Sequence, residues 1–301
     1  MSTTRRTRGK SRAMLDLIEA SHKILAEIQP ATVRAVCYRL FTLGLIPDMS
    51  KASTNKVSRQ LVYAREQGIV PWEWVVDETR EAERVSTWHN PDEIINAAVR
   101  GYRRDYWQDQ PVRVEVWSEK GTVRGTVAPV LNEYGVTFRV MHGFASATAL
   151  NSIAEASNDS EKPLIALYVG DYDPSGIYMS EVDLPERLGR YGGKVHLSRI
   201  ALLPTDTGRL PSFDVETKAK DGRYDWYRTR YGRQCWELDA MPPPLLRERV
   251  EAEIRAHILM DRWEHAVAVE RAETESMSTF LATWNSKLRP ATKYSEPRGS
   301  V

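Results

Sequence analysis

The sequence lacks several features that define whole classes of protein. It contains no apolar run near the roughly 20 residues that cross a bilayer, and its N-terminus is basic and polar where a secretory signal would be apolar. Its two cysteines, Cys37 and Cys235, match no metal-ligand spacing and favour a reducing compartment over a disulfide framework. We therefore expect a cytoplasmic protein with no membrane partner.

Metal-binding histidine pairs and a nucleotide-binding loop are missing as well. The six histidines form no ligand spacing. No Gly-x-x-x-x-Gly-Lys-Ser/Thr segment occurs, so the chain has no visible ATP-hydrolysing loop of that type. Charge of one sign is not in excess either, since 42 Lys and Arg balance 41 Asp and Glu. The net charge therefore gives no argument for nucleic acid.

Basic residues are nevertheless unevenly distributed, with two clusters near the N-terminus. Such clusters can neutralise phosphates, although a solvated, disordered tail explains the first one equally well. The first cluster opens the chain and the second follows some forty residues later: Arg5, Arg6, Arg8, Lys10 and Arg12, then Lys51, Lys56, Arg59 and Arg65.

The N-terminal part has the element order of a winged helix-turn-helix. With 301 residues, the chain is long enough for two domains. Apolar spacing predicts helices over 11–29, 31–43 and 53–67, followed by a β-type segment over 69–76. In a winged helix the third helix enters the major groove, where it would present Asn55, Lys56, Arg59 and Arg65 to DNA. Three-helix units that only pack against another element are equally common.

The middle of the chain alternates strands and helices. A helix over 91–106 comes first, and a charged helix over 245–288 follows the alternating region. The alternation predicts an α/β fold with a doubly wound, mostly parallel sheet, whose ligands gather beyond the carboxyl ends of the strands. The predicted strands are 112–117, 136–141, 164–169 and 195–201, and the predicted helices between them are 122–134, 145–156 and 174–188.

Acidic residues follow two of these strands. Asp171 and Asp173 come between a buried strand and a helix that begins at Pro174, and two carboxylates at this spacing can share a Mg²⁺ ion. Asp-x-Asp also occurs in many turns that bind no metal. Glu119 and Lys120 end the first strand of the same sheet, where a carboxylate can act as acid, base or metal ligand and a lysine can offset phosphate charge. An exposed Glu-Lys pair at a turn is the commoner case.

Together these motifs resemble the Toprim domain shared by topoisomerases, primases and some nucleases. The resemblance rests on Glu119-Lys120-Gly121, Gly143-Phe144 and Asp171-Tyr-Asp173-Pro-Ser-Gly176, each after a predicted strand. The extended aspartate motif is similar to the branch that contains topoisomerase VI A subunits and the meiotic double-strand-break transesterase. Arg34-x-x-x-Tyr38 resembles the tyrosine motif of that branch, and Trp236-Glu237-Leu238-Asp239-Ala240 resembles its Glu-Leu-x-Ala segment.

The resemblance implies a function and a set of roles. It implies Mg²⁺-dependent cleavage of duplex DNA, with Tyr38 as nucleophile, Arg34 assisting, Glu119 as acid, base or metal ligand, and Asp171 and Asp173 as metal ligands. It further implies a homodimer in which tyrosine and metal come from different protomers, a nucleoid-associated location, and a separate ATP-binding B-type subunit for any topoisomerase activity. Cys37 stands where some relatives have a first tyrosine, and the chain is short for a full A subunit.

The role of Tyr38 as a nucleophile can also be considered from residue spacing and phenol chemistry, apart from the resemblance. Arg34 and Tyr38 are four residues apart and share one helix face, where a guanidinium can hold a phosphate near the phenol. A phenol with a pKa of about 10 needs a base or electrostatic help to attack at neutral pH. The ordinary role of an aromatic residue at helical spacing is packing in the core.

The predicted organisation is a basic disordered arm (1–12), a winged-helix domain (13–108), a Toprim domain with C-terminal helices (109–290) and a disordered tail (291–301). Two other functions stay open: a Toprim nuclease that uses metal-activated water and leaves Tyr38 idle, and a DNA-binding protein without catalysis.

Overall fold

The computed structural model describes residues 11–76, 87–141 and 147–287. Contacts divide the chain into two compact units, one of Met1–Thr79 with Pro111–His257 and the other of Arg80–Gln110 with Ile258–Val301. This division differs from the predicted boundary between residues 108 and 109, because the segment before Pro111 groups with the C-terminal helix. Of the disordered arm predicted over 1–12, residues 1–10 lie outside the described residues, whereas Ser11 and Arg12 are described and Arg12 is already helical. The Gly143-Phe144 motif and the tail over 291–301 also lie outside the described residues.

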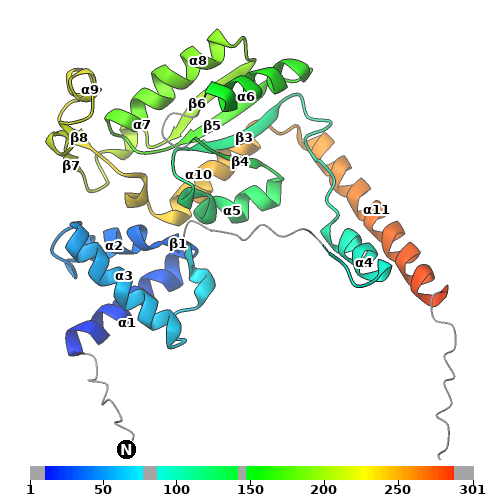
Figure 1. The fold of residues 1–301 in the computed structure, drawn as a ribbon, viewed down its shortest axis with the longest axis horizontal. Helices are drawn as coiled ribbons and strands as arrows, with labels where there is room; N and C mark the ends of the chain where they lie inside the picture. Colours follow the sequence, from blue (N-terminus) through cyan, green and yellow to red (C-terminus); the bar gives the residue numbers. More distant parts are fainter. Residues whose placement is uncertain (1–10, 77–86, 142–146, 288–301) are drawn as a thin grey trace, which may run out of the picture. The chain divides into compact units, whose positions relative to one another are not determined.

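Three helices build the N-terminal part of the first unit (Figure 1). They are α1 (Arg12–Ile28), α2 (Val33–Thr42) and α3 (Lys51–Glu66), close to the predicted ranges. Thr32 and Ser50 are the N-caps of α2 and α3, since their hydroxyls accept from backbone N–H groups in the first turn. The helices enclose one apolar core that includes Leu25, Val36, Leu40, Val57 and Leu61.

The β-type segment predicted over 69–76 is shorter than expected. Residues Trp72–Trp74 form a single 3₁₀ turn, and only β2 (Val75–Val76) is extended, paired in parallel with β1 (Ala31–Thr32). The guanidinium of Arg65 lies 4.2 Å from the centre of the Trp72 ring and donates to the Trp72 carbonyl at 3.1 Å. These contacts hold the turn, and no periodicity in the sequence indicates them.

The α/β prediction is confirmed by a four-stranded sheet whose strands are all parallel. The strands are β3 (Arg113–Ser118), β4 (Thr137–Val140), β5 (Leu164–Val169) and β6 (Val195–Ala201), in the order β4-β3-β5-β6. From β3 the chain first adds a strand on one side and then continues on the other. The strand order therefore reverses between β3 and β5, and ligands of open α/β sheets bind at such a point.

Helices cover both faces of the sheet (Figure 1). Helices α5 (Thr122–Tyr134) and α10 (Pro243–Arg255) pack together on one face, whereas α6 (Ala147–Asp159) and α8 (Leu184–Arg190) cover the other. Alternate residues of β5 point to opposite faces, as a buried parallel strand requires. Leu164, Ala166 and Tyr168 belong to the core beneath α6 and α8.

The helix predicted over 174–188 is interrupted. It consists of α7 (Pro174–Tyr178), one π-helical turn (Met179–Asp183) and then α8. Pro185 lies in the first turn of α8 and has no N–H to donate to the preceding turn, which explains why the regular ladder stops there.

A long excursion follows β6 and returns to the sheet edge. It contains a 3₁₀ turn (Pro204–Asp206), β7 (Phe213–Asp214), a second 3₁₀ turn (Val215–Lys218), α9 (Tyr224–Tyr231), β8 (Gln234–Cys235) and a third 3₁₀ turn (Leu238–Ala240). Strands β7 and β8 pair antiparallel. Tyr172 and Trp236 exchange two backbone hydrogen bonds of 2.8 and 2.9 Å, so the end of the excursion lies beside the Asp171–Asp173 loop.

The second unit pairs α4 (Pro91–Gly101) with α11 (Met260–Lys287). The helix predicted over 91–106 ends at Gly101, and beyond it Tyr106 and Trp107 pack on Trp263, at 4.7 and 5.9 Å between ring centres. The helix predicted over 245–288 is two helices, and the buried side chain of Gln110 bonds both N–H and C=O of Leu259 at the break. In the described part of the chain, every helix is too short or too polar to cross a membrane.

Candidate active site

The candidate site lies at the carboxyl ends of β3 and β5. These strands are hydrogen-bonded neighbours, paired from Arg113 with Leu164 to Ser118 with Val169. Glu119 follows directly after β3, and Asp171 and Asp173 follow β5 within four residues. Two strands whose last residues, Ser118 and Val169, are 51 residues apart in the chain therefore end at the same edge of the sheet, at the reversal of strand order.

The two aspartates are fixed by backbone N–H groups. Asp173 is the N-cap of α7, and its Oδ1 accepts from the Gly176 N–H at 2.8 Å. Oδ1 of Asp171 accepts from the Leu238 N–H at 2.9 Å. Gly176 is required here because a Cβ at this position would overlap the carbonyl oxygen of Asp171. Both carboxylates are buried, and their positions are set before any ligand arrives.

Arg199 on β6 fixes the Asp171–Asp173 loop, called the aspartate loop below, through hydrogen bonds to backbone carbonyls. Its guanidinium donates to the carbonyls of Gly170 (3.0 Å), Asp171 (3.2 Å) and Gly176 (2.6 Å), and it also reaches the Ser180 hydroxyl at 2.9 Å. The same group lies 5.0 Å from the centre of the Tyr168 ring. Burial lowers the pKa of Arg199. The guanidinium therefore ties β6, the aspartate loop and α7 together.

Glu119 shares the electrostatic environment of both aspartates. Burial raises the pKa of Glu119, and the negative charges of Asp171 and Asp173 raise it further. Lys120 and Lys218 act in the opposite direction. Glu119 is therefore close enough to the aspartates to be influenced by both.

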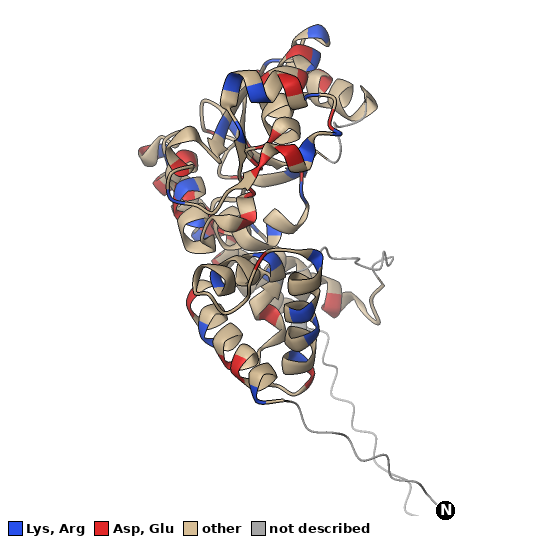
Figure 2. Ribbon diagram, turned by 90° about the vertical axis from the view of Figure 1, so that its left-hand side faces the viewer, with Lys and Arg blue, Asp and Glu red and all other residues tan. Residues whose placement is uncertain are grey.

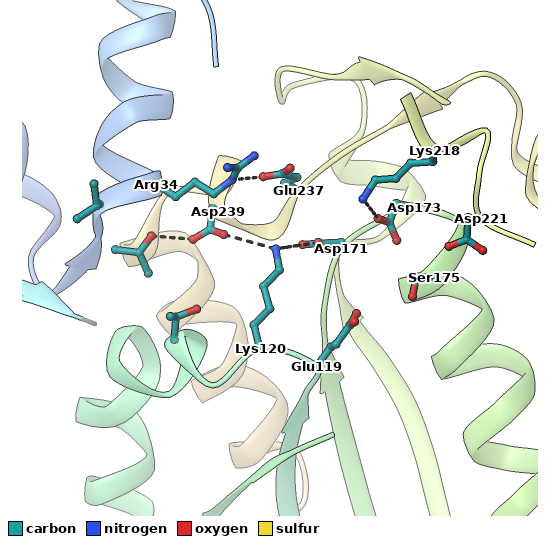
Figure 3. A pocket seen from close by; sticks show the side chains of 13 residues that line it. Arg34, Glu119, Lys120, Asp171, Asp173, Ser175, Lys218, Asp221, Glu237 and Asp239 are labelled. Carbon is teal, nitrogen blue, oxygen red and sulfur yellow. Dashed lines mark hydrogen bonds and ion pairs between the residues drawn. The ribbon is translucent and has the colours of Figure 1, made fainter. Parts of the chain in front are cut away.

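One pocket of about 680 Å³ brings five of the predicted site residues together (Figure 3). Six carboxylates and three cationic side chains line it, so negative charge is in excess. Glu119, Lys120, Asp171, Asp173 and Arg34 all border this space. The remaining lining residues are Thr32, Val33, Thr122, Ser175, Lys218, Asp221, Glu237 and Asp239.

Each aspartate is paired with a lysine. Nζ of Lys120 lies 2.8 Å from Oδ2 and 3.0 Å from Oδ1 of Asp171, and Nζ of Lys218 lies 3.1 Å from Oδ2 of Asp173. Lys120 is also 3.7 Å from Asp239. Burial disfavours the charged form of both lysines, but attraction to these aspartates dominates and raises the pKa of each.

Helix α2 contributes the opposite side of the pocket. The Thr32 hydroxyl, which caps α2, donates to Oδ1 of Asp239 at 2.7 Å. Nε of Arg34 donates to the carboxylate of Glu237. Burial disfavours the charged form of Arg34, yet Glu237 raises its pKa. The N-terminal helices are thereby attached to the 3₁₀ turn that follows β8.

Tyr38 lies next to Arg34 and is not among the residues that line the pocket. Its ring centre is 5.8 Å from the Arg34 guanidinium carbon, and the residue is only 6% exposed. Burial raises the pKa of Tyr38, and so does the negative charge of Glu237, while Arg34 lowers it. The phenol is therefore held in its protonated form more firmly than a free tyrosine.

The predicted DNA-binding residues fall into two groups. Asn55, Lys56 and Arg59 are exposed on α3. Arg65 is engaged with Trp72, and Lys120 is engaged with Asp171, so neither points freely to solvent. In Figure 2, basic and acidic residues are interspersed over the ribbon, in agreement with the balanced composition.

Sequence reasoning gave no role to several residues of the site. Glu237 and Asp239 were recognised only as part of a resemblance, and Arg199 and Thr32 carried no expectation. Glu237 and Asp239 are more than sixty residues from Asp171, and tertiary contacts place them there, among them the bridge between Tyr172 and Trp236 and the bond from the Leu238 N–H to Asp171. The alternating acidic residues in Glu237-Leu238-Asp239 were the only local signal.

The carboxylate oxygens of the pocket suit a hard divalent cation, although lysines pair with two of the carboxylates, Asp171 and Asp173. Glu119, Asp171 and Asp173 offer only oxygen, and the pocket has an excess of carboxylates. Within the described ranges, no group of three or more acidic, histidine or cysteine side chains is spaced to hold a metal. Binding of Mg²⁺ by all three carboxylates therefore requires the lysine pairs to open.

Comparison with known proteins found no relative: no family model, no curated protein and no solved structure matches this chain.

Proposed function

We propose that this protein cleaves double-stranded DNA by Mg²⁺-dependent transesterification in the manner of a topoisomerase VI A subunit, with Tyr38 as the nucleophile. A single observation carries the proposal. Glu119, Asp171 and Asp173 border one pocket at the reversal of strand order, together with Arg34, which also contacts Tyr38. In this reading, the sheet is a Toprim domain and the N-terminal helices are a winged helix.

The carboxylates are the proposed magnesium ligands. Glu119, Asp171 and Asp173 would hold Mg²⁺, which supplies Lewis-acid stabilisation of charge on the phosphate and on the departing sugar oxygen. The fixed N–H donors to Asp171 and Asp173 keep one oxygen of each carboxylate in place. The other oxygens remain available once the lysines have moved.

Arg34 is the proposed link between phosphate and nucleophile. Its guanidinium borders the pocket and is a strong bidentate donor for phosphate oxygens. The Tyr38 oxygen forms a bond to phosphorus while the bond from phosphorus to a sugar oxygen breaks. The phenol proton leaves to a base, and the sugar oxygen takes up a proton. The phosphotyrosyl bond conserves the energy of the phosphodiester, so the reverse reaction reseals the strand.

A homodimer and DNA contacts from α3 belong to the same proposal. Tyr38 does not line the pocket of its own chain, and by the resemblance Tyr38 and Arg34 of one protomer would act together at the metal pocket of the partner protomer. Asn55, Lys56 and Arg59 on α3 would contact the duplex. Any ATP-driven strand passage would need a B-type subunit. Such a protein would work in the cytoplasm, on the nucleoid.

The test is covalent capture on a denaturing gel. The full chain is mixed with labelled duplex and Mg²⁺ or Mn²⁺, and the expected product is a cleaved strand attached to protein. Tyr38→Phe should abolish the adduct, and Asp171→Asn with Asp173→Asn should abolish cleavage. Tyr191→Phe, at the end of α8, is the matched tyrosine control and should cleave normally.

Hydrolysis by metal-activated water is a second candidate, favoured by the burial and raised pKa of Tyr38. In this case Tyr38→Phe retains cleavage and no adduct forms with either protein. A third result is also informative. Duplex binding that Asp171→Ala does not change, with no cleavage in Mg²⁺ or Mn²⁺, would show a DNA-binding protein without catalysis.

A further inference from the structure

Lys120 and Lys218 lie beside Asp171 and Asp173, at positions where a metal ion bound by these aspartates would have to lie. Nζ of Lys120 lies between the two oxygens of Asp171, at 2.8 and 3.0 Å. Asp173 gives one oxygen to the Gly176 N–H, and Lys218 pairs with the other at 3.1 Å. Both aspartates are buried, so these ammonium groups neutralise charges that would otherwise be costly.

The lysines come from opposite sides of the pocket. Lys120 follows β3, whereas Lys218 ends the 3₁₀ turn Val215–Lys218 in the excursion after β6 (Figure 3). Two independent segments therefore each deliver one ammonium group to one aspartate. Glu119 lines the same pocket as both lysines.

Lysine is suited to a reversible contact of this kind. Its charge is a compact, strongly hydrated ammonium on a flexible four-carbon chain, so it can exchange partners without moving the backbone. The side chains of Lys120 and Lys218 are 35% and 39% exposed, which leaves them room to turn into the pocket. The aspartates cannot follow, because backbone N–H groups hold them.

We propose that Lys120 and Lys218 are built-in counter-cations that a divalent metal ion displaces from Asp171 and Asp173, and that the freed ammonium groups then bind oxygens of the DNA phosphate. The inference rests on the proposed function, since it takes the three carboxylates as the metal site. The lysines thus have two successive partners, a carboxylate without metal and a phosphate with it. They position the substrate and take no part in bond formation.

Opposite effects on metal binding and on cleavage follow from this exchange. Without a lysine, the metal no longer competes with an ammonium group, so it binds more tightly to the protein alone. With DNA present, a phosphate contact is missing, so cleavage at saturating metal is slower. If a lysine only supported the fold, its loss would weaken both metal binding and cleavage.

The experiment is calorimetric titration of the full chain with Mn²⁺ in the absence of DNA. Lys120→Gln and Lys218→Gln should each bind Mn²⁺ about fivefold more tightly than the wild type, as expected for loss of a competing ion pair worth about 1 kcal/mol. Lys120→Arg keeps the charge and should stay within about twofold of the wild type. Lys194→Gln, an exposed lysine before β6, is the control and should not change the affinity. Circular dichroism and thermal melting establish that each variant is folded.

The outcomes separate the two proposals. Asp171→Asn with Asp173→Asn tests the metal site itself, and undiminished Mn²⁺ binding in that variant would remove the proposed function. If that variant loses Mn²⁺ binding but Lys120→Gln and Lys218→Gln bind with unchanged or weaker affinity, only the displacement of lysines is wrong. Absence of Mn²⁺ binding in every protein would overturn both. Slower cleavage by the lysine variants at saturating metal, with tighter metal binding, supports the exchange.

Discussion

Arg34 and Glu237 are 203 residues apart in the chain, and they form an ion pair at the edge of the carboxylate pocket. The pair joins α2 to the turn after β8, and a second link from Thr32 to Asp239 runs beside it. Glu237 also lies near Tyr38, whose pKa it raises. One carboxylate therefore holds the proposed phosphate-binding arginine and opposes ionisation of the proposed nucleophile.

The rate of adduct formation should rise with pH. Tyr38 attacks as the phenolate, and burial together with Glu237 keeps its pKa above that of a free phenol, so the phenolate fraction is small at neutral pH. We expect up to about a tenfold gain per pH unit wherever the protein stays folded. Glu237→Gln removes a negative charge, lowers the pKa of Tyr38 and should move the profile to lower pH. The measurement is the initial rate of adduct formation as a function of pH.

Glu248→Gln is the control for this series, since Glu248 is exposed on α10 and should leave the profile in place. A rate that does not depend on pH would argue against a tyrosine nucleophile.

Arg199→Met should destabilise the protein strongly. The substitution leaves the carbonyls of Gly170, Asp171 and Gly176 without their shared donor, and we expect a loss of about 3 kcal/mol in the free energy of unfolding. Arg190→Met removes an exposed arginine from the end of α8 and should change stability by less than about 0.5 kcal/mol. Urea denaturation of both variants provides the comparison, and equal losses would contradict the assigned role of Arg199.

Gly176→Ala and Gly189→Ala should have opposite effects. A Cβ at Gly176 meets the carbonyl oxygen of Asp171, so we expect a loss of about 2 kcal/mol and weaker metal binding. Gly189 is in α8 with nothing within 4 Å of the added carbon, and alanine there should stabilise the protein by about 0.5 kcal/mol. Thermal unfolding distinguishes the two, and a harmless Gly176→Ala would show that the aspartate loop is less constrained than its contacts indicate.

Duplex binding should depend on Lys56 and Arg59. Both are exposed on α3, and replacing either with Gln should lower the affinity and reduce the slope of log affinity against log salt by about 0.9. Arg65→Gln should instead lower the stability of the protein, because Arg65 packs on the Trp72 ring and donates to the Trp72 carbonyl. Lys23→Gln on α1 is the control, since Lys23 pairs with Glu19. Fluorescence anisotropy at several salt concentrations provides the slopes, and unchanged slopes for Lys56 and Arg59 would place the DNA elsewhere.

Local sequence determined the alternation of strands and helices. The predicted ranges of α5, β5 and β6 coincide with those observed, because continuous apolar runs and alternating or helical periodicity reflect burial of a single element. Gly135 ends α5 in the left-handed conformation, with φ of 60°, as a glycine after a helix often does. The same pattern predicted where β3 and β5 end. It therefore also supported the expectation that Glu119 and the aspartates share one edge of the sheet.

Tertiary contacts decided the remaining features. Gln110 bonds Leu259 at the break between α10 and α11, and the pairing of α4 with α11 depends on contacts between segments that are distant in the sequence. Likewise, Lys218, Glu237 and Asp239 reach the pocket only through the path of the excursion after β6. Periodicity records whether a residue is buried, and it contains no information about which distant residue covers it. The sequence by itself therefore determined the elements and the edge of the sheet that carries the acidic residues, whereas the fold decided which charges meet there.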